Sequence, residues 1–297
     1  MRCLIGFAVA AFTALPLTAC SLGNEWEYRS EVDLTRTTDH IPESGIFVDT
    51  KNGRIEVVAD PQRTDVLIEA HVRCKGRNQE EADQRLAATT LSITRDVNQQ
   101  LVIRPVFPDS HRGGDGASFS IRVPDANGVN LDTSNGSVVA TSLSGDLVID
   151  TSNGAIKVTD HDGDAHIDTS NGTVTVTNLS GSLWADTSNG RVALNNVGGP
   201  VDADTSNGSI KLVLAGDQSG PIKLDTSNGS ITVDVGPAFA GAVRFDTSNG
   251  SIHVTDVTGR ISSSSLSRNK GRITVGEGGQ ASFLDTSNGS IHFRIAG

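Results

Sequence analysis

The chain has 297 residues, with 24 Lys and Arg against 35 Asp and Glu and a formal net charge of −11. This acidic balance argues against nucleic acid and anionic lipid headgroups as partners. Aromatic residues make up only 4% of the chain, whereas there are 32 glycines. Such a composition is typical of thin, repetitive β-structure rather than of a globule with one thick core.

The N-terminal segment is typical of a bacterial lipoprotein signal peptide. Arg2 supplies a short positive region, residues 4–17 are mostly apolar, and the stretch ends in Leu17-Thr18-Ala19-Cys20, which resembles a lipobox. The apolar run is too short for a preferred membrane-spanning helix. We therefore predict a signal peptide over residues 1–19 and a lipid on Cys20, which attaches a protein to a membrane without spanning it. Ser21 resembles the sorting pattern of the outer membrane, and an ordinary cleaved secretory signal is the alternative.

Residues 20–124 predict a tether followed by a small module. Residues 20–45 are polar and lack clear periodicity, which indicates a tether, and residues 46–124 indicate a β-rich lead-in module with one helix. The helix is expected over residues 78–91, because apolar residues recur there at roughly helical spacing without Pro or Gly. Strands are expected at residues 46–48, 54–58, 66–72, 101–106 and 119–123. Cys74 is left alone after signal removal and lipidation, so no internal disulfide framework is expected and the thiol is predicted to be buried.

Residues 125–297 are organised by a repeat. The pentapeptide DTSNG occurs eight times, and its glycines follow one another at intervals of 18 or 21 residues once a decayed copy ending at Gly271 is included. A second Gly divides each period, and apolar residues alternate along both halves, as at Leu147, Ile149, Ile156 and Val158. Fixed periods of this size and strands with one buried face predict an all-β fold, a parallel β-helix or β-solenoid with two main strands per coil. We expect it to be right-handed, with nine coils.

The repeated motif is interpreted as a structural corner. Asn-Gly tolerates the positive φ angles of a tight turn, and stacked Asn side chains can bond to one another along a parallel coil. Thr has the parity of the inward residues, which argues against an exposed ice-binding ladder. The residues of the predicted turn ladder are Asp132, Asn135, Gly136, Asp150, Asn153, Gly154, Asp168, Asn171, Gly172, Asp186, Asn189, Gly190, Asp204, Asn207, Gly208, Asp225, Asn228, Gly229, Asp246, Asn249, Gly250, Asp285, Asn288 and Gly289.

The aspartates of the motif are the residues that a purely structural interpretation explains least well. Stacked carboxylates repel one another, so each must accept hydrogen bonds from turn amides or have cations nearby. Calcium between the coils is therefore an alternative, although DTSNG does not match the known calcium-binding repeat. We expect no cofactor.

Two other groups of residues are candidate sites. His161, Asp162, Asp164 and His166 could form a metal site, but their places at a corner and on an alternating strand favour a structural role. Trp184 could form a sugar platform, but its neighbours face inward, so we expect it to face solvent. The aspartates share one sequence context, which gives no distinct acid and base for glycoside cleavage. We expect no catalytic residues.

The stretches FVDTKNGRIEVV, EEADQRLAATTLSI and FSIRVP, followed by tandem DTSNGSI with SGxL turns, carry a family resemblance. Over residues 46–297 the chain resembles the putative-adhesin β-strand-repeat family of bacterial envelope proteins, which is related to GIN-type head domains. The resemblance implies a β-solenoid in the cell envelope and implies no catalytic residues.

Together these observations predict a non-enzymatic envelope lipoprotein, held to the outer membrane by its lipid. Its rigid acidic solenoid would serve as an adhesin-like or interaction scaffold for a protein or polysaccharide partner. The alternatives are a polysaccharide-binding or polysaccharide-cleaving β-helix protein and a calcium-stabilised rod.

Overall fold

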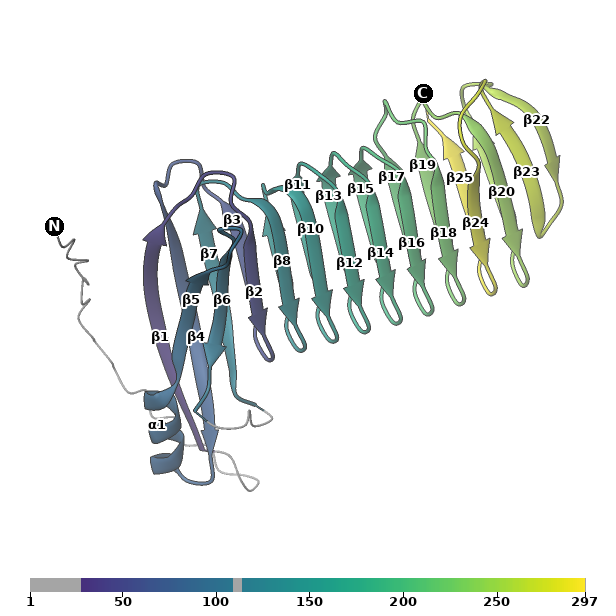
Figure 1. The fold of residues 1–297 in the computed structure, drawn as a ribbon. Helices are drawn as coiled ribbons and strands as arrows, with labels where there is room; N and C mark the ends of the chain where they lie inside the picture. Colours follow the sequence, from purple (N-terminus) through teal and green to yellow (C-terminus); the bar gives the residue numbers. More distant parts are fainter. Residues whose placement is uncertain (1–27, 109–113, 297) are drawn as a thin grey trace.

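The computed structural model describes residues 28–108 and 114–296, which form an elongated rod of two long β-sheets with one helix at one end (Figure 1). Sheet A has 12 strands and sheet B has 13. The helix is α1 (Gln79–Ala88). The strands are β1 (Tyr28–Asp39), β2 (Ile46–Thr50), β3 (Ile55–Ala59), β4 (Asp65–Gly76), β5 (Thr90–Arg95), β6 (Leu101–Val106), β7 (Gly116–Val123), β8 (Asn127–Thr133), β9 (Val138–Thr141), β10 (Ser144–Thr151), β11 (Ile156–His161), β12 (Ala165–Thr169), β13 (Val174–Leu179), β14 (Leu183–Thr187), β15 (Val192–Val197), β16 (Val201–Thr205), β17 (Ile210–Leu214), β18 (Ile222–Thr226), β19 (Ile231–Val235), β20 (Gly241–Thr247), β21 (Ile252–Asp256), β22 (Ile261–Leu266), β23 (Lys270–Val275), β24 (Ser282–Thr286) and β25 (Ile291–Ile295).

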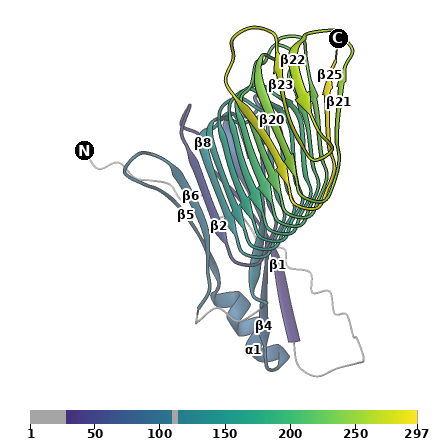
Figure 2. The ribbon, with the colours of Figure 1, turned by 90° about the vertical axis from the view of Figure 1, so that its right-hand side faces the viewer.

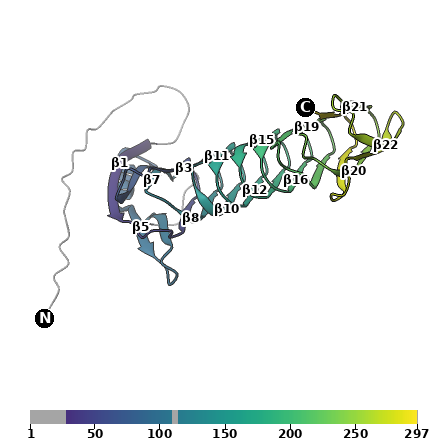
Figure 3. The same ribbon diagram turned by 90° about the horizontal axis from the view of Figure 1, so that it is seen from above.

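The central part of the rod is the predicted β-solenoid. From β8 to β19 the chain alternates between the sheets, with the even-numbered strands in sheet B and the odd-numbered strands in sheet A. Each strand pairs in parallel with the equivalent strand of the next coil. One strand per sheet completes a coil, and the coils follow one another along the rod (Figure 3). The predicted fold class and the two strands per coil are therefore confirmed.

The core lies between the two sheets and is built from the alternating apolar residues. Ile149 and Ile167 from sheet B and Val158 and Val176 from sheet A are all 0% exposed. Because every second side chain of a strand points inward, each coil adds a thin layer to one continuous core. No single layer is thick, which explains how a chain with so few aromatic residues can fill it.

The lead-in segment is part of both sheets. β2 pairs with β8 and β3 pairs with β9, so residues 46–59, with the variant motif DTKNG, form the first coil. Residues 28–39 form β1, which pairs antiparallel with β4 along its whole length. The tether prediction is therefore wrong for these residues. β1 is an edge strand held by backbone hydrogen bonds, and most of its side chains remain exposed, so its sequence carries little apolar periodicity.

The predicted helix is present but is shorter than expected. Asn78 caps its N-terminus, because the Asn78 side chain accepts a hydrogen bond from the Glu81 amide at 2.8 Å. The helix ends at Ala88, and Leu91 belongs to β5, which pairs with β6. Two β-branched residues, Thr89 and Thr90, follow the helix, and extended backbone suits such side chains better than helix. α1 packs against β4 and β1.

The C-terminal coils do not follow the order of the sequence. β24 lies between β18 and β20 in sheet B, as Figure 1 shows, and β25 lies between β19 and β21 in sheet A. The decayed copy around Gly271 forms no coil. It lies in the β22–β23 hairpin, and β23 pairs antiparallel with β20. The expectations that each motif stacks on the next and that Gly271 marks a ninth coil are therefore wrong. The hairpin covers the end of sheet B, so the last repeat enters the stack instead of extending it.

The corner glycines predict a sharp stability effect. A Cβ on Gly190 would lie 1.7 Å from the carbonyl oxygen of Gly172, whereas a Cβ on Gly216 would meet nothing within 4 Å. We expect Gly190→Ala to lower the free energy of unfolding by about 1–3 kcal/mol, since backbone must move to admit the methyl group. Gly216→Ala is the control and should leave stability within about 0.5 kcal/mol. Urea unfolding followed by circular dichroism measures both, and equal effects would contradict this account of the corner.

Candidate functional site

The threonines of the motif hold neighbouring coils together. All eight are 1% exposed or less. Each donates a hydrogen bond from its hydroxyl to the carbonyl of a motif glycine in the adjacent coil, as Thr187 does to Gly172 at 3.1 Å. The prediction that Thr faces inward is confirmed. These threonine hydroxyls therefore form hydrogen bonds within the core and do not form an exposed ice-binding face.

The asparagines form the predicted side-chain ladder. Asn153 Nδ2 donates to Asn135 Oδ1 at 2.9 Å, and the same bond joins each neighbouring pair of coils. The corners that carry this ladder follow one another along the rod, as the end-on view in Figure 2 shows. In spatial order the ladder contains Asn52, Asn135, Asn153, Asn171, Asn189, Asn207, Asn228, Asn288 and Asn249.

A second, shorter ladder lies at the opposite corner of the coil, and the sequence analysis missed it. Ser142, Asp160, Asn178 and Asn196 all have positive φ angles between 54° and 59°. Asn196 donates to Asn178 at 2.9 Å, and Asn178 donates to Asp160 at 2.6 Å. Asn and Asp are the non-glycine residues that most readily adopt a positive φ angle, so the sequence does indicate this corner. The glycine that follows recurs more regularly, so the periodicity points to that glycine and not to the Asn and Asp positions.

The aspartates of the motif form a continuous column on the outer face of sheet B. The strand registers place the residues of this aspartate column in one line, and its members in spatial order are Asp49, Asp132, Asp150, Asp168, Asp186, Asp204, Asp225, Asp285 and Asp246. Neighbouring strands of a sheet lie about 4.8 Å apart, so the carboxylates repeat at that spacing. Figure 1 shows the strands of sheet B that carry the column side by side along the rod.

Within the described residues, the central carboxylates of the aspartate column make no direct hydrogen bond or ion pair. Across residues 28–108 and 114–296, none of its carboxylates accepts a hydrogen bond from a turn amide, so that predicted explanation is wrong. Basic side chains pair directly with its two ends, and Lys223, which pairs with Asp202 beside the column, attracts Asp204 and Asp225 at longer range. Arg104 Nε lies 3.2 Å from Asp49, and Lys270 Nζ lies 3.2 Å from Asp246. Thr, Asn and Gly each hold the corner, whereas Asp contributes no contact that stabilises it.

The aspartate column is electrostatically unfavourable. Partial burial raises the pKa of Asp168, and the neighbouring carboxylates of Asp150 and Asp186 raise it further. The pKa of Asp132 is raised in the same way, first by burial and then by Asp49 and Asp150. Asp204, Asp225 and Asp285 also have raised pKa values, each with burial as the first cause. The ionised form of these five aspartates is therefore disfavoured by the fold.

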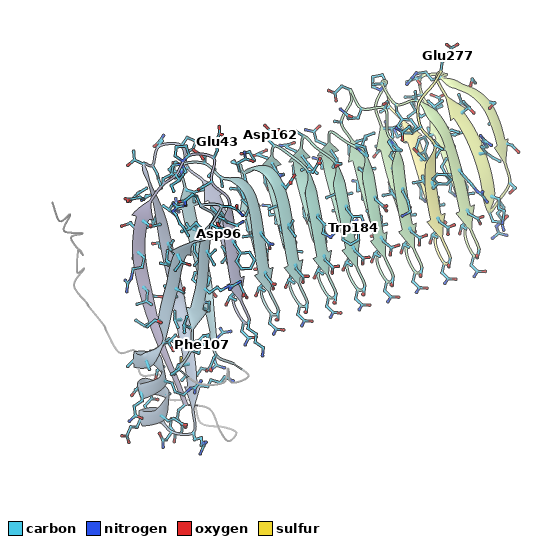
Figure 4. The ribbon with its side chains drawn as sticks, viewed as in Figure 1. Glu43, Asp96, Phe107, Asp162, Trp184 and Glu277 are labelled. Carbon is cyan, nitrogen blue, oxygen red and sulfur yellow. The ribbon has the colours of Figure 1, made fainter. Side chains whose placement is uncertain are left out.

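A mixed row of side chains runs beside the column, two residues before each aspartate. Two exposed hydrophobic members are Val148, at 37%, and Phe283, at 48%. Trp184, which Figure 4 labels on this face, stacks on His166 with ring centroids 4.0 Å apart and an interplanar angle of 6°. These rings belong to adjacent strands, so one face of Trp184 is covered by His166. The prediction that Trp184 faces outward agrees with this position, but the covered ring face makes it a poor sugar platform.

The residues of the HDGDAH stretch have separate structural roles. His161 is buried, and its Nε2 lies 2.9 Å from the Gly145 carbonyl oxygen. Burial lowers its pKa. His166 belongs to the outer face of sheet B, while Asp162 and Asp164 accept hydrogen bonds from Ser180 and Ser182 of the next coil. In the described part of the chain, no three His, Cys, Asp or Glu side chains are placed to hold one metal ion.

Two remaining predictions concern Cys74 and Cys20. Cys74 is buried as predicted, and burial raises the pKa of its thiol. The predicted lipidation site, Cys20, and the signal peptide lie outside the described residues. Within the residues that are described, no helix is both long and apolar enough to cross a membrane.

Comparison with known proteins identifies the family. The Toastrack DUF4097 family matches residues 44–294. The chain belongs to this family. A crystal structure from Bacteroides fragilis, described as a putative adhesin, is similar with a TM-score of 0.50 and 13% identity, covering 89% of this chain and 97% of that one. Another, from Parabacteroides distasonis and also described as a putative adhesin, has a TM-score of 0.40 and 10% identity over 89% of this chain and 97% of its own. No curated protein matches the chain. The similarity to the first structure supports the fold.

The aspartate column of this Toastrack protein predicts a pH-dependent stability change. The raised pKa of Asp168 means that its contribution to stability is present below the ordinary value of 3.8 and is lost as the pH rises through the folded-state pKa. At pH 7 we therefore expect Asp168→Asn to raise the free energy of unfolding by about 0.2–1 kcal/mol, the usual range for cross-strand pairs.

At pH 3 the gain should largely disappear, because the native carboxyl is then mostly protonated. Urea unfolding at both pH values measures the effect. Asp146→Asn is the matched control, since Asp146 is exposed on β10 outside the column. A loss of stability from Asp168→Asn at pH 7 would show that the carboxylate holds the fold after all.

Proposed function

We propose that this Toastrack protein is a non-enzymatic scaffold of the bacterial envelope that makes adhesin-like contacts through the outer face of sheet B. The observation that carries the proposal is the aspartate column. Every complete copy of the motif places a carboxylate there, although the carboxylates repel one another and hold no corner. A feature that opposes stability and yet recurs in every coil is best explained by a role outside the fold.

The rigid architecture suits such a role. The side chains of the column are fixed by strands whose registers are set by the Asn ladder and the Thr hydrogen bonds. A partner would therefore meet a preformed, acidic and nearly flat surface, and little conformational entropy would be lost on binding. The partner is a protein or a polysaccharide in this proposal, and nucleic acid is disfavoured by the charge.

The proposed location rests on the N-terminal sequence. A lipid on Cys20 would tether the rod to the outer membrane. β1 begins at Tyr28, so few residues would separate the lipid from the first strand. The end of the rod that carries β1 and α1 would then lie nearest the membrane, and the repeats would extend away from it.

The two alternative functions make different predictions. A polysaccharide-cleaving protein requires an acid and a base in unlike surroundings, but the column offers equivalent carboxylates. A calcium-stabilised rod requires the melting midpoint to rise with calcium and to fall with a chelator. An unchanged midpoint would remove calcium as a structural ion.

The proposal predicts that removing charge from the column weakens attachment without weakening the fold. Asp150→Asn, Asp168→Asn and Asp186→Asn combined should reduce attachment of producing cells to their surface or to neighbouring cells at least several-fold. Glu69→Gln, Asp217→Asn and Asp234→Asn combined remove the same charge outside the outer face of sheet B and should not. Equal amounts of protein are confirmed by immunoblotting, and equal loss by both variants would contradict a role for the column.

Exposure of intact cells to a protease tests the location in the same strains. Cleavage, with a periplasmic protein intact as the control, would place the rod outside the cell. Protection would place it in the periplasm, and the adhesin proposal would then be withdrawn in favour of an envelope partner inside the outer membrane.

A further inference from the structure

The C-terminal coil, formed by β24 and β25, occupies a slot between two coils that precede it in sequence. β24 pairs in parallel with β18 on one side and β20 on the other. β25 pairs in the same way with β19 and β21. Both edges of the coil are therefore bonded, so the slot has two walls that come from elsewhere in the chain.

The walls of the slot select a coil with the Asn-Gly corner. Asn288 donates to Asn228 at 2.9 Å and accepts from Asn249 at 2.9 Å. Thr286 donates to the Gly229 carbonyl at 2.8 Å, and a Cβ on Gly289 would lie 1.9 Å from the same oxygen. A segment with Asn and Gly at these positions bonds to both walls and admits the close approach of the Gly229 carbonyl.

The interior of the slot also fits this coil in particular. The ring of Phe293 meets Phe239 and Phe245 edge-on, with centroids 5.7 Å and 5.6 Å apart. The buried hydroxyl of Ser282 accepts a hydrogen bond from the Ile222 amide at 3.0 Å. Phe293 and Ile295 are 1% exposed or less. The segment with all of these features is the C-terminal coil of this chain.

Residues 276–281, with the sequence GEGGQA, link the coil to the preceding hairpin. The link must pass over β20, because the strand order in sheet B is β23–β20–β24. Residues 277–281 are exposed, and Gly276, Gly278 and Gly279 have φ angles of 59°, 73° and 80°. A short, exposed and glycine-rich link of this kind resembles the hinge at which proteins exchange an element between copies.

None of the contacts that hold the coil depends on its belonging to the same chain. For the coil to enter, β20 to β23 must stand away from β18 and β19, because these elements form the far wall. In that open state the slot is equally accessible to a C-terminal coil from another molecule. We propose that two copies of this chain exchange their C-terminal coils, so that β24 and β25 of each copy fill the slot of the other.

The exchange can be detected with cysteines that face each other across the slot wall. Lys223 and Phe283 are register partners on β18 and β24, and both are exposed. One full-length chain carries Lys223→Cys and a second, differently tagged chain carries Phe283→Cys, and both are produced in one cell. After treatment with a short bis-maleimide, we expect a covalent dimer that contains both tags, which forms only when the coil of one chain sits in the other.

The matched control uses a pair that exchange cannot bring together. Val148 and His166 are exposed register partners on β10 and β12, within the sequential part of the rod. Val148→Cys and His166→Cys on separate chains should give no linked dimer above the unsubstituted chain, which sets the background from its native cysteines. One chain with both Lys223→Cys and Phe283→Cys confirms that the two thiols react. A two-tag dimer no more abundant than in the control mixture would overturn the proposal.

Shortening the link supplies a second, independent test. Deleting Gly278 and Gly279 leaves four residues to cross β20, a span of about two strand spacings or roughly 10 Å, and removes two residues with positive φ from the turn. A short hinge under strain favours exchange between copies. We expect the fraction of two-tag dimer to rise at least several-fold in this variant. An unchanged fraction in a folded protein of unchanged circular dichroism would also overturn the exchange. Neither readout depends on attachment, so this inference and the proposed function can fail separately.

Discussion

The structure depends on the close stacking of one corner on the next. At Gly190 a methyl group would lie 1.7 Å from the carbonyl oxygen of Gly172, so the corner tolerates only glycine. This approach brings the Asn side chains within hydrogen-bond distance and sets the Thr hydroxyls under the neighbouring carbonyls. Once the corners are aligned, the strand registers follow, and every second side chain enters the core. The flanks can vary because they need only be apolar at alternate positions.

The same alignment creates the aspartate column. A residue that precedes a fixed corner must appear at the same place in every coil, so its charge is repeated along one face. Asn gains from this repetition because its amide both donates and accepts along the stack, and Thr gains because its hydroxyl donates to a glycine carbonyl of the adjacent coil. Carboxylates can only accept, and they repel when stacked. The fold therefore explains why the aspartates are aligned but not why they are aspartates, and the proposed contact surface accounts for that choice.

The insertion of the C-terminal coil follows from the uniformity of the repeats. All coils present the same corner and the same ladders, so backbone pairing does not distinguish sequential from inserted stacking. The choice is made by elements outside the repeat. The β22–β23 hairpin covers the end of sheet B, and Phe293 fills the space between Phe239 and Phe245. Identical coils could stack in several orders along the rod. The irregular parts of the chain determine which order forms.

The sequence alone determined the solenoid, the inward Thr, the Asn ladder and most lead-in strands, because period and parity are local and are repeated many times. It did not reveal β1, whose edge position requires few apolar residues, or the early end of α1. Nor did it show that the aspartates lack turn amides, since the direction of a side chain at a corner depends on the backbone angles. The order of the last coils was decided only by the tertiary structure, because equivalent repeats have equivalent local sequence and differ only in what they pack against.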